Sequence, residues 1–561
     1  MRFNTATGAA ALAAVAAPVL AKEMPVNEQI AAEFYDSGII HQGLLARKLA
    51  TWSQMNLREA SQYPRLNYTK CVNGVAEAIP GDAGNTFKCR NFDLYDFINH
   101  EELGSFGYYQ GIKTGSSIWG WTDPESGREF AASGVYDGVS FLEVLPTGRL
   151  VFVGFLPKIA PQLASGAYWT EIRPYKHYMV IGSELVGNGV QIFDMSKLVS
   201  VDPSEYPYQF TNEDDLTGHY NATLPLGRSH NVVVNEELEY GVAVGAQPRT
   251  EVCGSGLHFF SLEDPSNPVP LGCNGDDGYI HDAQCLVYRG PDEKYQGKDI
   301  CYGYNEDTLT IYDVTDKANS YIISRTSYEG ARYTHQGWVN DVNWQEFLFM
   351  DDELDEGVAG TPAADGYPVT FIWDIRDLES PKQTGLYKAT NRGIDHNQYV
   401  FGDLIYQSNY GAGMRVYDIS SVPSDPTGKG VCEIGYFDTH PEDDNLFGGG
   451  IVDFIGSWHS YAGFKSGYTL INTIERGVFL VKMTKRDTCK PNPCSADNCL
   501  RAMRANSVPG RLEQSQQFCG EFTKTFIADV AVVPSYARDT CGDNVISRVS
   551  SACECLPTAA A

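Results

Sequence analysis

Histidines recur at one place in a repeated pattern along this chain of 561 residues. Four of them stand just ahead of a β-rich run, and each is followed at once by Asn, Asp or Gln: His230, His281, His335 and His396. A fifth, His459, follows Trp458 at the last such place. Neutral imidazole binds zinc, copper, iron, manganese or nickel, and it also serves as a general acid or base. The spacing therefore predicts a shared chemical role.

Acidic side chains recur at a second place, between the second and third β-rich runs of a repeat. They are Glu184, Glu306, Asp307, Asp351, Asp352, Glu353 and Glu475, the last beside Arg476. Carboxylates bind divalent cations, and opposite charges about 4 Å apart attract by several kcal/mol in partly dry surroundings. Imidazole and carboxylate together favour a divalent ion.

One sequence pattern occurs seven times, and it predicts the strands that must position these groups. An apolar, β-rich run leads into a turn, as in VQIFDMSKL from Val190, LTIYDVTDK from Leu309 and MRVYDISSV from Met414. The copies lie roughly 45–65 residues apart, the length of one four-stranded propeller blade with variable loops. We expect an all-β protein, a seven-bladed β-propeller over residues 104–485. The Asp that ends four of the runs is interpreted as a turn cap, with catalysis unsupported.

Propeller geometry brings the two sets of side chains to one rim. The start of a blade's first strand and the loop between its second and third strands lie at the same face. The predicted ligands of one divalent ion are His230, His281, His335, His396, Glu306, Asp351 and Glu353. Candidate catalytic residues are His281, His335, Glu306, Asp352, Glu475 and Arg476. The alternative is structural: a histidine at a blade start can simply brace neighbouring loops by hydrogen bonding.

Other chemical signals are weak or missing from the sequence. It has no Gly-x-Ser-x-Gly elbow, phosphate-cradling loop or dinucleotide fingerprint. Four tryptophans favour core or channel packing over sugar stacking: Trp119, Trp121, Trp169 and Trp338. Net charge is −29 without a basic stripe, which argues against a nucleic-acid partner.

The segments that flank the propeller have distinct signatures. Residues 22–103 combine helical spacing over 27–60 with an extended piece from Asp93 to Gly104, which could supply a ring-closing strand. Residues 486–561 form a module with seven cysteines, which we expect disulfides to hold together. Predicted pairs elsewhere are Cys71 with Cys89, Cys253 with Cys273, and Cys285 with Cys301. Cys432 is left over and is predicted to tie the module to the ring.

The chain carries the marks of an exported protein. Residues 1–21 resemble a secretory signal peptide, with Arg2 ahead of an apolar stretch and small residues at its end. Fourteen cysteines fit an oxidising compartment, and Asn67 and Asn221 stand in glycosylation sequons. No later stretch is long and apolar enough to span a membrane. We expect an extracellular monomer.

Long motifs in the repeats resemble the choice-of-anchor B family. They include Ser117-Ile118-Trp119-Gly120-Trp121, His281-Asp282-Ala283-Gln284-Cys285, Thr334-His335-Gln336-Gly337-Trp338 and Asp395-His396-Asn397-Gln398-Tyr399. The repeated pattern is similar to the LVIVD repeat of secreted and surface-anchored propellers, over about residues 90–485. The Cys-rich tail looks like modules of secreted proteins from filamentous fungi. The resemblance implies the fold and the location, and it implies no particular reaction.

Two functions are compatible with these observations. The first is a secreted or cell-surface binding or scaffold protein, whose rim holds a divalent cation and engages an extracellular or cell-wall ligand. The second is a secreted metal-dependent hydrolase or lyase that acts on a polar small molecule or glycan. The sequence does not decide between them.

Overall fold

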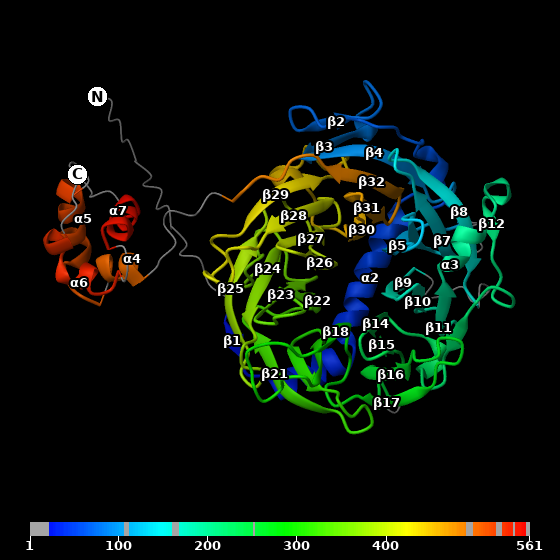
Figure 1. Cartoon of the computed structure of the whole chain (residues 1–561), viewed down its shortest axis with the longest axis horizontal. Helices are drawn as coiled ribbons and strands as arrows, with labels where there is room; N and C mark the ends of the chain where they lie inside the picture. The colour runs from blue at the N-terminus through cyan, green and yellow to red at the C-terminus, as the bar shows by residue number, and fades with distance from the viewer. Residues whose placement is uncertain are drawn as a thin grey trace, which may run out of the picture.

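The protein is a seven-bladed β-propeller in a computed structural model (Figure 1). The structure describes residues 22–105, 111–159, 168–250, 253–489, 498–505, 507–522, 530–541 and 545–556. The predicted signal peptide lies outside these ranges. Each blade contains a four-stranded antiparallel sheet whose first strand lies nearest the central channel, as expected from the repeat.

The first four blades follow one another along the chain. They are β5 (Gly115–Thr122), β6 (Glu129–Val135), β7 (Gly138–Val144) and β8 (Leu150–Pro157); β9 (Thr170–Tyr175), β10 (Tyr178–Ser183), β11 (Val190–Asp194) and β13 (Gly218–Tyr220); β14 (Asn231–Asn235), β15 (Tyr240–Val244), β16 (Leu257–Ser261) and β17 (Pro270–Asn274); and β18 (Asp282–Val287), β19 (Asp299–Tyr304), β20 (Leu309–Asp313) and β21 (Tyr321–Tyr328).

The last three blades complete the ring. They are β22 (Thr334–Val339), β23 (Phe347–Asp352), β24 (Val369–Asp374) and β25 (Lys382–Lys388); β26 (Gln398–Phe401), β27 (Leu404–Ser408), β28 (Met414–Asp418) and β29 (Cys432–Phe437); and β30 (Ser457–Tyr461), β31 (Tyr468–Thr473), β32 (Gly477–Met483) and β4 (Phe92–Asn99). Short strands extend three outer edges: β1 (Glu23–Met24), β2 (Val75–Glu77) with β3 (Thr86–Arg90), and β12 (Tyr208–Gln209).

An N-terminal strand closes the ring, as the sequence predicted. β4 pairs antiparallel with β32, from Phe92 opposite Met483 to Asn99 opposite Gly477. The last blade therefore takes three strands from the end of the propeller and one from its beginning. Closure covers the edge of β32, which would otherwise be free to pair with another chain.

In the four blades that carry it, the repeated Asp caps the turn after the third strand. Backbone N–H groups two residues later donate to its carboxylate at 2.9 Å for Asp194, 3.1 Å for Asp313 and 3.0 Å for Asp418. Such Asx turns satisfy backbone groups at the outer surface. The apolar residues of the pattern meanwhile face the neighbouring blades, where they form the core.

Helices flank the propeller at both ends of the chain. The N-terminal ones are α1 (Glu28–Ile30), a π-helix (Ala31–Asp36) and α2 (Ile39–Gln54), and α3 (Ser196–Ser200) lies in the second blade. The C-terminal module contains α4 (Asn498–Met503), α5 (Arg511–Phe522), α6 (Ser535–Arg538) and α7 (Val545–Glu554). Short 3₁₀ turns span Ala60–Gln62, Ala83–Asn85, Pro203–Glu205, Pro225–Gly227, Phe447–Gly449 and Val530–Val532. No helix in the described parts of the chain is long and apolar enough to cross a membrane.

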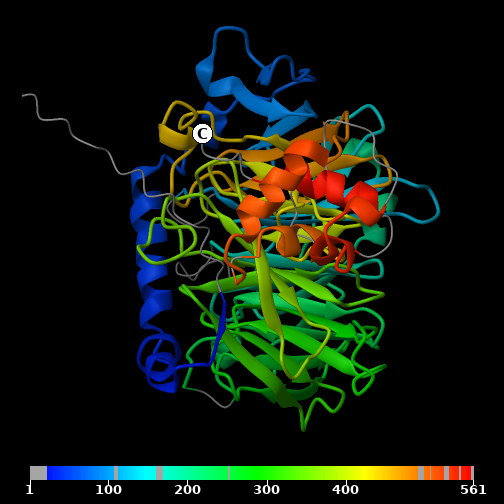
Figure 2. The same cartoon turned by 90° about the vertical axis from the view of Figure 1, so that its left-hand side faces the viewer.

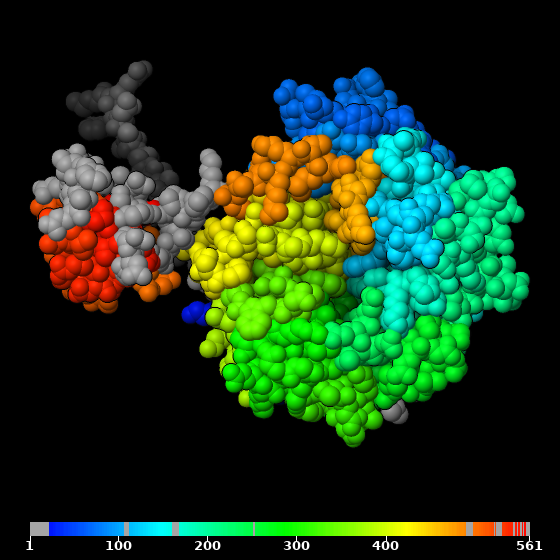
Figure 3. Space-filling view, in the orientation of Figure 1, coloured from blue at the N-terminus to red at the C-terminus, as the bar shows by residue number. Residues whose placement is uncertain are grey.

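Helix α2 lies flat across one face of the disc and passes over its centre (Figures 1 and 2). Its buried side chains are Leu44, Lys48 and Trp52, one face of a helix at a spacing of four residues. The indole Nε1–H of Trp52 donates to the carbonyl of Phe454 at 2.8 Å. The opposite face shows the blades following one another around the centre, with α2 hidden behind them (Figure 3).

Disulfides connect neighbouring elements. The structure pairs Cys71 with Cys89, Cys253 with Cys273, and Cys285 with Cys301, the three pairs read from the sequence. Cys432 pairs with Cys489, at the start of the segment that follows the propeller. Within the C-terminal module, Cys499 pairs with Cys541 and Cys519 pairs with Cys553.

Candidate metal and ligand site

Six aromatic side chains form a closed ring at the mouth of the channel, beneath α2. Going round, they are Trp169, His230, His281, His335, His396 and Trp458, and each comes from the start of a different blade. Centroids of successive histidines lie 4.2, 4.2 and 4.3 Å apart. The tryptophans complete the circle, with 4.5 Å from His396 to Trp458 and 6.2 Å from Trp169 to His230. The four histidines predicted to converge therefore do so.

The fifth histidine does not join this ring. His459 is one residue beyond Trp458, so its side chain points to the other side of the strand. Its Nδ1 lies 2.9 Å from the hydroxyl of Ser117, and its ring stacks on Tyr399 with centroids 4.7 Å apart. Trp458 takes the corresponding place in the last blade.

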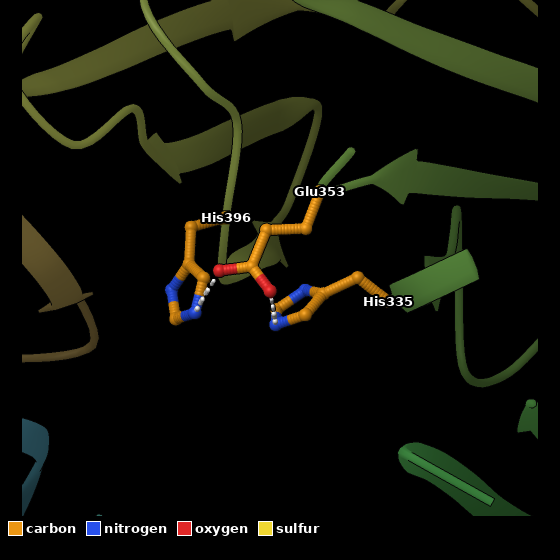
Figure 4. A group of neighbouring side chains, drawn as sticks. All are labelled: His335, Glu353 and His396. Atoms are coloured by element: carbon orange, nitrogen blue, oxygen red, sulfur yellow. Dashed lines mark ion pairs between the residues drawn. The ribbon is translucent and has the colours of Figure 1, made fainter. Parts of the chain in front are cut away.

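Glu353 lies at the centre of the strongest candidate metal site (Figure 4). It follows β23, and its carboxylate reaches His335 Nε2 at 3.9 Å and His396 Nε2 at 3.6 Å. One ligand atom from each of the three residues falls within 4.8 Å of the others. Two bonds of about 2.1 Å to one ion span at most about 4.2 Å, so a metal ion can bridge the separations of 3.9 and 3.6 Å between the carboxylate and the two imidazoles. These three side chains could hold a metal ion, and all are fully buried.

A lysine from α2 reaches the same carboxylate. Lys48 Nζ lies 2.7 Å from Glu353 Oε1, and the hydroxyl of Tyr410 donates to that oxygen as well. The ammonium also lies over the rings of Trp458 and Trp169, at 5.1 and 6.0 Å from their centroids. Aromatic faces attract a cation that has left water. The other oxygen, Glu353 Oε2, has no hydrogen-bond partner among the described residues.

Neighbouring groups hold the histidine rings in defined orientations. The Nδ1 atoms of His281 and His396 lie 2.7 and 2.8 Å from the backbone carbonyls of His335 and Trp458. A carbonyl only accepts, so each Nδ1 carries the proton and each Nε2 keeps its lone pair. Metal-binding histidines in proteins show the same pattern.

The burial of the ring favours neutral histidines. Desolvation lowers the pKa values of His281, His335 and His396 well below the ordinary range. The neighbouring imidazoles and the Lys48 ammonium act in the same direction. Neutral imidazole is the form that binds a metal, so a site of this kind needs no proton release near neutral pH.

Some of the predicted acidic residues contact the histidine ring, and others form hydrogen bonds elsewhere. Glu184 binds His230, with its Oε1 2.6 Å from Nδ1, and Asp351 Oδ1 lies 3.3 Å from His335 Nδ1. Glu306 instead accepts two hydrogen bonds from Arg249, at 2.8 and 2.9 Å. Asp352 accepts from Tyr328 and from three backbone N–H groups, which is the environment of a loop brace.

Glu475 and Arg476 are engaged with residues outside the ring. Glu475 Oε1 lies 2.8 Å from Nδ1 of His440, and its Oε2 accepts from the backbone N–H of Gly456 at 2.9 Å. Arg476 donates to Glu442 and lies over the ring of Tyr63, 4.6 Å from its centroid. These contacts explain both side chains as structural.

A cavity of about 630 Å³ lies beside the ring, against the first half of α2. Aromatic residues Tyr136, Tyr168 and Trp169 line it together with Glu184 and Arg228. A smaller cavity shares its lining residues His41, Leu45, Trp169 and Glu184, and also touches Lys48, His230 and His281. The large cavity therefore borders the histidine ring.

Sequence reasoning missed Lys48 and Tyr410. Helical spacing over residues 27–60 did indicate a helix, but nothing local says which blade mouths that helix covers. Tyr410 belongs to a turn after β27, at the place where other blades carry acids, and there it supplies a hydroxyl instead.

Comparisons with known proteins add little to this description. No protein-family model matches the chain, and no curated protein matches it. One solved structure that it resembles is the computationally designed Ika8 protein, at 11% sequence identity and a TM-score of 0.39. The match covers 75% of this chain and 96% of the designed one. A likeness of that degree carries no argument about function.

Proposed function

We propose that this protein is a secreted β-propeller of the choice-of-anchor B family, which binds an extracellular ligand beside a divalent metal site at the channel mouth. The metal site is proposed to consist of His335, His396 and Glu353, with His230 and His281 completing the histidine ring. The observation that carries the proposal is the ring itself. Four imidazoles lie side by side, and two have Nδ1 fixed by carbonyls, which leaves Nε2 as the donor atom.

Export is part of the same proposal. Disulfides throughout the described chain favour an oxidising compartment, and Asn67 and Asn221 are both exposed, as glycan attachment requires. The chemistry of the donors points to a transition metal such as zinc, copper, iron, manganese or nickel, because several imidazoles and one carboxylate suit these ions better than calcium.

The cavity next to the ring favours a second candidate function, that of a metal-dependent enzyme. A metal-dependent hydrolase or lyase needs a place for its substrate within reach of the metal, and the cavity of about 630 Å³ borders Trp169 of the ring and Glu184, the partner of His230. Such volumes are typical of small-molecule sites. Turnover of a panel of esters, amides and glycosides by the metal-loaded protein separates this function from simple binding.

The metal site is tested by elemental analysis of the secreted protein. We expect about one equivalent of a divalent transition metal in the wild type, and a loss of at least tenfold in His335→Ala and in His396→Ala. The control is His177→Ala, an exposed histidine whose side chain is 43% accessible. All variants should keep the cooperative thermal transition of the wild type.

Two outcomes would contradict the metal site. One is a wild type that stays metal-free after incubation with Zn²⁺, Cu²⁺, Fe²⁺, Mn²⁺ or Ni²⁺ in turn. The other is equal metal content in the ring variants and the His177 control. Either would make the histidine ring a structural brace.

A further inference from the structure

We infer that the cavity beside the histidine ring binds an aromatic carboxylate, with Arg228 as the residue that recognises its charge. The inference rests on the proposed function in one respect: it places this ligand next to the proposed metal site. Two features of the cavity carry it, namely the aromatic wall and an arginine that forms no ion pair among the described residues.

The wall of the cavity is built from interlocking rings. The centroids of Tyr136 and Tyr168 lie 5.0 Å apart at 84°, and those of Tyr168 and Trp169 lie 5.9 Å apart at 64°. Trp52 of α2 packs against this wall from outside the cavity lining, with its ring centroid 4.9 Å from that of Tyr168. Edge-to-face surfaces of this kind suit a flat aromatic ligand, because a ring can pack against the face of one side chain and the edge of the next.

Arg228 is the one lining cation that lacks an ion-pair partner among the described residues. Arg249, which also lines the cavity, is bound through two hydrogen bonds to Glu306. Lining Glu184 is already bonded to His230 at 2.6 Å. Arg228 is half-buried and has no such bond among the described residues, although its charge acts on Glu184 in the same lining. A guanidinium in this state favours a ligand with a negative charge.

The experiment uses three naphthalene probes whose polar groups are an anion, a neutral amide and a cation: 2-naphthoate, 2-naphthamide and 2-naphthylmethylamine. Titration calorimetry on the full secreted protein measures their dissociation constants. We expect the naphthoate to bind at least tenfold more tightly than the amide, and the amine to bind most weakly. In Arg228→Gln the preference of the naphthoate over the amide should disappear, while the affinity for the amide stays the same.

Two variants separate this inference from the proposed metal site. Arg289→Gln removes an arginine on the surface that pairs with Glu237, and it should keep the preference for the acid. His335→Ala should lose the metal and still bind the naphthoate, whereas Arg228→Gln should keep the metal. A failure of one proposal therefore leaves the other measurable.

Three results would overturn the inference. They are equal binding of the acid and the amide by the wild type, tighter binding of the amine, and the absence of binding heat for all three probes in a protein that still melts cooperatively. An unchanged preference in Arg228→Gln would also overturn it, since the charge would then be read by another group.

Discussion

Lys48→Met is expected to lower the free energy of unfolding by about 3–5 kcal/mol, because it leaves the Glu353 carboxylate buried without its counter-ion. The Lys48 side chain is 4% exposed and that of Glu353 is fully buried, so water can replace little of the lost interaction. Tyr410 still donates to Glu353, but a neutral donor does not balance a charge. Urea titration of the propeller measures the change.

The double variant Lys48→Met with Glu353→Gln is expected to recover most of that loss. A neutral pair needs no compensation inside the protein, and replacing both members of a buried ion pair often costs little. The control is Lys176→Met, which breaks a pair with Glu239 whose side chains are 45% and 41% exposed. Exposed pairs contribute about 0–1 kcal/mol. If Lys48→Met were as mild as this control, Lys48 would not be the counter-ion of Glu353.

The buried pair of His440 and Glu475 is expected to give the propeller a strong pH dependence. Burial alone would lower the pKa of His440, but the hydrogen bond and charge of Glu475 outweigh it and raise that pKa to about 9. Glu442 and Asp443 act in the same direction. Burial likewise favours a raised pKa for Glu475, but His440 and Arg476 lower it to about 2.

The two shifts define a window of pH. Protonated His440 stabilises the fold fully below its unfolded pKa of about 6.5, and the contribution is lost as pH rises through about 9. Ionised Glu475 stabilises the fold fully above its unfolded pKa of about 4.5, and this is lost as pH falls through about 2. The pair therefore contributes most between about pH 4.5 and pH 6.5.

His440→Gln measures this contribution against the wild type. At pH 5.5 we expect the variant to be less stable by about 3 kcal/mol, the value of a shift of about two units in pKa. By pH 9.5 most of the difference should be gone, because the wild-type histidine is then largely neutral. His177→Gln, an exposed histidine, should differ little from wild type at either pH. A constant gap for His440→Gln from pH 5.5 to pH 9.5 would show that the ion pair contributes no net stability.

The features that the sequence predicted correctly are repeated and local. Every blade repeats the strand pattern and four of them repeat the turn cap, so Asp194, Asp313 and Asp418 indicate the same Asx turn. The histidines share one place in that repeat, and rotation about the channel then brings them together without further information. The closing strand was also readable, because an extended segment ahead of the first blade matched a strand that the last blade lacked.

The assignment of the acids could not be read in the same way. Glu306 and Glu353 have the same side chain and occupy similar loops, but Arg249 captures one of them and Lys48 the other. Both cations come from segments far away in the sequence, a loop of another blade and the N-terminal helix. Pairing of this kind depends on how separate elements dock, which no local pattern encodes. The cavity could not be predicted either, because its walls are formed by the docking of the helix against three neighbouring blades.

The pairing of β4 with β32 has a consequence for biosynthesis. Phe92 pairs with Met483, which is synthesised about 390 residues later. At ordinary rates of translation this delay is roughly 20–80 s. Until then the propeller is an incomplete ring, and the strand edges at its two ends are both unpaired. Closure of the propeller is thus postponed to the end of synthesis, because the first strand of the pair cannot be covered before the last blade has been made.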